Sequence, residues 1–143
     1  MHEIHTEIEI KAPRKKVWEI FTDFESYPHW NPFIRSLEGD ISEGGTLRVE
    51  MEPHGSKPMK FRPTVLAIKP QEEFRWKGKL IMPGIFDGEH IFRFEKINGN
   101  TTKFIQREKF TGIAVSMLLK NMEEGIKKSF EEMNTRLKNI AED

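Results

Sequence analysis

Hydrophobic and polar residues alternate with a period of two over most of the chain. In residues 2–10, Ile4, Ile8 and Ile10 share one face with Thr6, while charged residues take the other face. This alternation is typical of a half-buried strand. The same period returns after Pro32 and predicts further strands at residues 33–37, 47–51, 60–68, 74–80, 90–94 and 104–110.

Helical spacing interrupts this pattern between the first strand and the second. Ala12-Pro13 suits a first helical turn, and it is followed by apolar residues at helical intervals, namely Val17, Trp18, Ile20, Phe21 and Phe24. Asp23 can cap a second short helix that runs through Tyr27 and ends at Pro28. We therefore expect two short helices after strand one.

The C-terminal part of the chain has the spacing of a long helix. Apolar residues recur there at intervals of three and four: Val115, Leu119, Met122, Ile126, Phe130, Met133, Leu137 and Ile140. They form one apolar stripe along a helix of roughly seven turns. The spacing predicts that residues 115–140 are mostly one helix.

Consecutive strands joined by turn signals such as Asn98-Gly99 indicate an antiparallel meander. A meander with one apolar face needs a cover, and the C-terminal helix is long enough to supply it. We therefore predict an α+β fold, in which a curved antiparallel sheet of about seven strands wraps around the long C-terminal helix. Residues 1–143 are expected to form a single domain.

Composition restricts the possible partners. Lys and Arg total 23, as do Asp and Glu, so no basic surface indicates nucleic-acid binding. Cysteine is absent, and residues 1–10 lack an apolar signal core, so we expect a cytoplasmic protein without stable membrane association. The five histidines do not cluster with carboxylates at ligand spacing. We expect no metal and no cofactor.

Several segments resemble a known superfamily. The segments are Val17-Trp18 through Asp23-Phe24, Tyr27-Pro28, Trp30-Asn31-Pro32, Trp76-Lys77-Gly78, Gly88-Glu89-His90-Ile91-Phe92 and Glu108-Lys109-Phe110-Thr111-Gly112. Over essentially its whole length the chain resembles the START-like (SRPBCC) superfamily of birch-pollen-allergen-like proteins, polyketide cyclases/dehydrases and lipid-transfer domains. The resemblance implies a helix-grip fold with a hydrophobic cavity. It does not fix a reaction, because the superfamily includes carriers, receptors, enzymes and chaperone cofactors.

Polar residues on faces that should point inward are the candidates for chemistry. A period of two places His90 on the same face as Phe92, and it places Gln106 and Glu108 with the inward phenylalanines of their own strand. Trp76 joins them from a neighbouring strand. Buried polar groups need partners, so these residues either satisfy one another, meet water near a rim, or bind a ligand.

His90 and Glu108 are predicted to lie opposite each other. A three-residue loop, Asn98-Gly99-Asn100, would keep the apolar residues of both strands on one face and set the two side chains directly across the pair. Their attraction favours a charged imidazole and an ionised carboxylate, and desolvation disfavours both. The pair is a candidate polar anchor or acid–base pair, and the alternative is a purely structural ion pair.

Three functional hypotheses follow. The first is a carrier or sensor that binds a small hydrophobic, lipid- or polyketide-like ligand through Trp76, His90, Phe92, Gln106, Glu108, Met122, Ile126 and Phe130. The second is an enzyme of the cyclase/dehydratase type, with Glu108 or His90 as general acid or base. The third is a chaperone-cofactor-like interaction protein, which should expose an apolar patch outside the cavity.

Overall fold

The computed structural model describes residues 2–79 and 84–143. A five-stranded antiparallel sheet has the order β1-β8-β7-β6-β5, and a second sheet has the order β2-β3-β4. The strands are β1 His2–Ile10, β2 Ile34–Gly39, β3 Leu47–Met51, β4 Met59–Phe61, β5 Thr64–Lys69, β6 Glu73–Lys79, β7 Asp87–Asn98 and β8 Thr101–Thr111. The helices are α1 Arg14–Thr22, α2 Tyr27–Trp30, α3 Val115–Leu119 and α4 Glu123–Glu142, with a short 3-10 helix at Phe24–Ser26.

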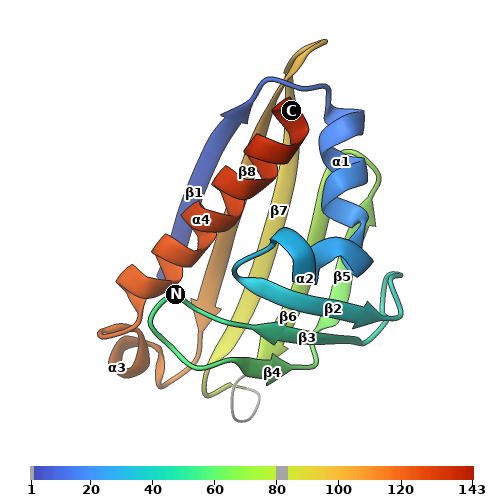
Figure 1. Ribbon diagram of the computed structural model, residues 1–143. Coiled ribbons are helices and arrows are strands. Elements are labelled where there is room, and N and C mark those ends of the chain that lie inside the picture. Colours follow the sequence, from blue (N-terminus) through green and yellow to red (C-terminus); the bar gives the residue numbers. More distant parts are fainter. Residues whose placement is uncertain (1, 80–83) are drawn as a thin grey trace.

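The helices and the three-stranded sheet cover the same face of the five-stranded sheet. In Figure 1, α4 lies across β1 and β8, and α1 lies beside it near one end of the large sheet. The β2-β3-β4 sheet crosses the other end of the large sheet, away from α1. The predicted α+β architecture, with a sheet around a long C-terminal helix and short helices after strand one, is confirmed. The interior lies between these layers.

Aromatic rings fill the interior beneath α1. Phe21 is fully buried, and its ring centroid lies 4.8 Å from that of Phe92 and 5.1 Å from that of Phe94. Phe74 and Phe104 contact the same ring at 6.0 Å and 5.9 Å. Such close-packed aromatic side chains bury large apolar areas and contribute strongly to core stability. The interior beneath α1 is therefore closely packed.

The apolar stripe of α4 faces the sheet as the spacing predicts. Ile126, Phe130, Met133 and Leu137 are all buried. At the C-terminal end of the stripe, Ala141 is buried in place of the predicted Ile140. The stripe also carries two polar residues into the interior, Ser129 and Asn134.

Residues 115–140 are mostly one helix, as predicted, but the helix is interrupted at a single point. Residues 120–122 separate α3 from α4, and the Met122 backbone N–H donates to the Leu119 carbonyl, as in a 3-10 turn. The new helix starts where the Ile126 N–H donates to the Met122 carbonyl. The break leaves Leu119 buried and Met122 packed against the core, so the apolar spacing continues through it.

The predicted strand at residues 60–68 is two strands in different sheets. Pro63 lies between β4 and β5, and a proline lacks the N–H needed to continue a ladder. A bulge between Val65 and Ala67 then reverses the alternation, so that Ile68 instead of Ala67 lies opposite the inward Phe74. Leu80, the last residue of the predicted strand at residues 74–80, lies outside the described residues.

The β7–β8 hairpin has the predicted register but not the predicted loop. Asn98 pairs with Thr101, which leaves a two-residue turn, and a bulge at Ile97 takes up the extra residue. A bulge adds one unpaired residue to a strand, and a three-residue loop adds one residue to the turn. Either change shifts the pairing register by one residue, so the inward faces of the two strands still match. From Phe94 opposite Phe104 onward, the pairing is as predicted.

Replacing Phe130 with Asp should destabilise the protein severely. Phe130 is 0% exposed, and the substitution would bury an unpaired charge in an apolar interior. We expect the free energy of unfolding in urea to fall by more than about 4 kcal/mol, or folding to be lost. The exposed Thr135→Asp on the same helix is the control and should change stability by about 0.5 kcal/mol or less. A comparably small effect of Phe130→Asp would contradict the packing of α4.

Candidate functional site

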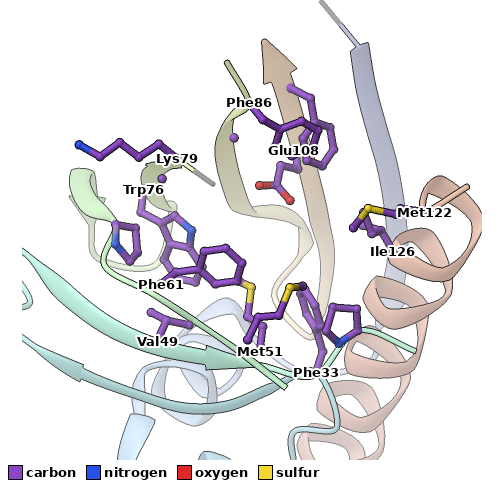
Figure 2. A pocket seen from close by; sticks show the side chains of 16 residues that line it. Phe33, Val49, Met51, Phe61, Trp76, Lys79, Phe86, Glu108, Met122 and Ile126 are labelled. Atoms are coloured by element: carbon purple, nitrogen blue, oxygen red, sulfur yellow. The ribbon is translucent and has the colours of Figure 1, made fainter. Parts of the chain in front are cut away.

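An apolar pocket opens where the two sheets meet the N-terminal end of α4. It has a volume of about 100 Å³. The small sheet and its loops supply Phe33, Val49, Met51, Pro53, Met59, Phe61 and Pro63; the large sheet and its loops supply Trp76, Gly78, Lys79, Phe86, Gly88, Glu108 and Phe110; Met122 and Ile126 close it from the helix side. Figure 2 shows the Glu108 carboxyl pointing into this space. We call it the Glu108 pocket.

Two glycines leave space for the pocket on the inward face of the large sheet. Gly78 of β6 and Gly88 of β7 are directly paired, one row beyond the Trp76–His90 pair on the same inward face. A Cβ atom at Gly78 would touch only the Pro63 side chain, at an ordinary 3.7 Å. A Cβ atom at Gly88 would overlap Oε2 of Glu108. The missing side chain at Gly88 therefore leaves the space that the carboxyl occupies.

The predicted contact between His90 and Glu108 is present. The two residues are paired across β7 and β8, and Nδ1 of His90 lies 3.6 Å from Oε1 of Glu108. The His90 side chain is 0% exposed, and the Glu108 side chain is 17% exposed, toward the pocket. His90 thus lies behind the lining, and Glu108 is part of it.

A hydrogen-bonded network holds the other side of the imidazole. Nε2 of His90 lies 3.0 Å from Oε1 of Gln106, and Nε2 of Gln106 donates to Oδ1 of Asn134 at 2.7 Å. Nδ2 of Asn134 donates to the Thr6 hydroxyl at 2.9 Å, which in turn donates to the Gln106 backbone carbonyl at 2.8 Å. All four residues are buried, so the network fixes the imidazole plane.

Desolvation prevails over attraction in the His90–Glu108 pair. Burial lowers the pKa of His90 from 6.5 to about 3, against the opposing effect of the Gln106 hydrogen bond. Burial likewise raises the pKa of Glu108 from 4.5 to about 8. At neutral pH the imidazole is neutral and the carboxyl is protonated.

The eight residues predicted to bind ligand separate into two groups. Trp76, Glu108, Met122 and Ile126 line the Glu108 pocket. The other four, His90, Phe92, Gln106 and Phe130, are fully buried in the core behind it. His90 and Gln106 instead belong to an internal hydrogen-bonded cluster, the arrangement that the sequence left open as an alternative. A ligand-binding role for the eight stays a prediction.

Sequence reasoning missed two parts of this region. The small sheet contributes Met51, Met59 and Phe61, whose strands could not be placed over the large sheet from periodicity. Asn134 could have been found, because it lies four residues after Phe130 and three before Leu137 and therefore on the same face of the helix as the apolar stripe.

Outside the pocket, two apolar side chains near α3 are exposed. Ile113 is 88% exposed and Met117 is 71% exposed. Met117 lies outside the apolar stripe, because α3 turns Val115 and Leu119 inward instead.

Within residues 2–79 and 84–143, no three His, Asp or Glu side chains are grouped so that they could hold a metal ion. None of the helices in this part of the chain combines the length and apolar character needed to span a membrane.

The sheet, the covering helix and the pocket define a helix-grip protein. The chain belongs to the family described as polyketide cyclase/dehydrase and lipid transport, whose model matches residues 1–142. No curated protein matches the sequence.

Solved structures share the fold at low sequence identity. The Zhui aromatase/cyclase from Streptomyces sp. R1128 is 15% identical, with a TM-score of 0.78 over 98% of this chain and 93% of that one. A norcoclaurine synthase point mutant from Thalictrum flavum, in complex with a transition-state analogue, is 12% identical, with a TM-score of 0.72 over 98% and 93%. Ara h 8.0201 is 15% identical, with a TM-score of 0.72 over 98% and 97%.

Stability should fall between pH 6.5 and pH 8 because of Glu108. Between pH 4.5 and about pH 8, Glu108 of the folded protein holds a proton that the unfolded chain has released. The free energy of unfolding therefore decreases as pH rises through this range. His90 acts in the opposite direction between about 3 and 6.5, because there the unfolded chain holds the extra proton. The two effects oppose each other from pH 4.5 to 6.5, and above that range Glu108 acts without His90.

Urea unfolding at pH 6.5 and pH 8 measures this effect. We expect the wild type to lose stability relative to Glu108→Gln, which cannot titrate, with a slope of at most about 1.4 kcal/mol per pH unit. Groups common to both proteins cancel in the comparison. Equal slopes for the two proteins would show that Glu108 has an ordinary pKa.

Proposed function

We propose that the protein binds a small apolar molecule with one hydrogen-bonding group in the Glu108 pocket, as a carrier or sensor. The observation that carries this proposal is one carboxyl group directed into a pocket whose lining is otherwise apolar except for Lys79. Binding sites for small molecules commonly combine apolar walls, which supply affinity, with a few polar groups that fix orientation. The family description, which includes lipid transport, is consistent with such a role.

The walls of the pocket suit an occupant of variable shape. Met51, Met59 and Met122 contribute flexible thioether side chains from three different elements. The volume of about 100 Å³ is below the roughly 300–1,000 Å³ typical of sites for drug-sized ligands. We therefore expect either a ligand of about one aromatic ring or a larger one that displaces the methionines.

Binding of N-phenyl-1-naphthylamine, an uncharged fluorescent probe, tests the proposal. The probe should increase its emission on binding, raise the melting temperature and be displaced by neutral lipids or polycyclic aromatic compounds. Gly78→Val should abolish binding, because its side chain would enter the open space beside Pro63 while valine is well tolerated in strands.

Lys77→Val, on the exposed face of the same strand, is the matched control and should bind the probe like the wild type. Equal affinity of Gly78→Val and Lys77→Val would place the probe elsewhere and contradict the proposal. Thermal unfolding of both variants verifies that they are folded.

General acid–base catalysis of the cyclase/dehydratase type is a second candidate function. It is favoured by the Glu108 carboxyl of the pocket, whose pKa is raised to about 8, and by the neutral imidazole of His90, which lies 3.6 Å behind it. Groups that titrate near the working pH are suited to proton transfer. The interaction-protein hypothesis stays a prediction, with Ile113 and Met117 as its exposed apolar residues.

Exchange of the α-protons of acetophenone in D₂O, followed by NMR, tests the second candidate. A carboxyl and imidazole pair that transfers protons should accelerate exchange by about 100-fold or more over buffer. Glu108→Gln should remove the acceleration, and Glu95→Gln, exposed on the outer face of β7, should retain it. Exchange at the buffer rate with the wild-type protein would argue against catalysis and leave binding unaffected.

A further inference from the structure

The internal network fixes which nitrogen of His90 carries the proton. Nε2 of Gln106 lies within 3.4 Å of the Phe130 backbone carbonyl, which can only accept, so this end of the Gln106 amide is the donor. Its other end, Oε1, is then an acceptor and requires a hydrogen on Nε2 of His90, 3.0 Å away. A neutral imidazole protonated on Nε2 has a bare lone pair on Nδ1.

The lone pair on Nδ1 of His90 faces Glu108. Among the described residues, Nδ1 is buried without a hydrogen-bond partner, and Oε1 of Glu108 lies 3.6 Å from it. A proton on Oε1 satisfies both groups after a small rotation of the carboxyl, whereas an ionised carboxylate would face another acceptor. We call this arrangement, with a single proton carried by Oε1 of Glu108 and directed at Nδ1 of His90, the one-proton pair.

The second carboxyl oxygen is left for the pocket. Oε2 of Glu108 occupies the gap beside Gly88, where a Cβ atom would overlap it. With the proton on Oε1, Oε2 is a carbonyl-like acceptor. Lys79, the basic residue of the lining, extends away from the carboxyl in Figure 2. An anionic ligand group at Oε2 would lie beside an acceptor without a compensating cation, which is costly in an apolar site.

We infer that the Glu108 pocket selects an uncharged ligand that donates a hydrogen bond, a phenol or an alcohol, to Oε2 of Glu108. This inference rests on the proposed function and specifies its ligand class. Ethers and ketones of the same shape lack the donor, and carboxylates carry the wrong charge.

Three ligands that differ in one group test the inference: 4-propylphenol, 4-propylanisole and 4-propylbenzoate. Their dissociation constants are measured at pH 7 by NMR titration, with the Trp76 indole N–H as the reporter within the pocket. The phenol should bind at least about fivefold more tightly than the anisole, the value of one hydrogen bond to a buried group. The benzoate should bind most weakly.

Two substitutions of Glu108 separate a neutral acid from a carboxylate. Glu108→Gln offers the same pattern as the neutral acid, an N–H toward His90 and a carbonyl toward the ligand, so its affinity for the phenol should stay within about threefold of wild type. Glu108→Leu removes the acceptor and should weaken phenol binding by about 5- to 100-fold. If Glu108→Gln loses as much affinity as Glu108→Leu, the one-proton pair is overturned.

Gly88→Ala tests the position of the acceptor while keeping the carboxyl. Its methyl group should displace Oε2, so the preference for the phenol over the anisole should disappear. Gly78→Ala, whose methyl group meets only Pro63, should lower the affinity for the phenol and the anisole equally and so preserve the preference for the phenol.

The outcomes separate the two proposals. If the anisole or the benzoate binds the wild type as tightly as the phenol does, the ligand class is wrong, although an apolar pocket that binds the fluorescent probe remains. If neither the probe nor any of the three ligands binds, the proposed function itself fails.

Discussion

The pairing of β7 with β8 determines which side chains reach the interior. Because side chains alternate between the two faces of a strand, a slip of one residue would turn every inward phenylalanine outward and bring charged residues into the core. The observed register sets Phe94 opposite Phe104, Phe92 opposite Gln106 and His90 opposite Glu108. The neighbouring strands continue these rows, with Trp76 of β6 beside His90 and Ile4 of β1 beside Glu108. The polar pair is thus part of the same alternation that builds the core.

The protonation of that pair follows from a competition between two large energies. Attraction between unit charges about 4 Å apart is roughly 4 kcal/mol at the effective dielectric constant near a protein surface. Removing both ions from water costs several kcal/mol for each of them. With His90 fully buried and Glu108 exposed only toward an apolar pocket, the neutral forms prevail. A single proton placed between the two groups would satisfy both of them without creating either charge.

Periodicity predicted the features that depend on which side chains are apolar. These include the inward faces of β7 and β8, the stripe of α4 and the juxtaposition of His90 with Glu108. It could not predict features that leave the apolar pattern intact. The bulge at Ile97 replaces one loop residue without changing the facing pairs from Lys96–Thr102 inward, and the break before α4 keeps Met122 packed against the core. Both are properties of backbone hydrogen bonding.

The candidate site was predictable only where it follows the strands of the large sheet. The position of the small sheet over this face depends on long-range packing, so Met51 and Met59 were not foreseen as pocket walls. The charge state of His90 and Glu108 depends on the depth of burial, which no local pattern reports. Burial also decides that His90 supports Glu108 from behind instead of meeting the pocket directly.

The pocket exists because side chains are missing from one row of the sheet. Phe110, Gly88 and Gly78 follow one another across β8, β7 and β6, so a bulky residue is succeeded by two positions without a side chain. The two glycines are not equivalent, because a side chain at Gly78 would only fill space, whereas one at Gly88 would also displace the carboxyl of Glu108. Space for an apolar ligand and the position of the polar group that would orient it are therefore coupled at Gly88. A substitution at Gly88 alters both the affinity for ligands and the preference among them, whereas a substitution at Gly78 alters only the size of the pocket.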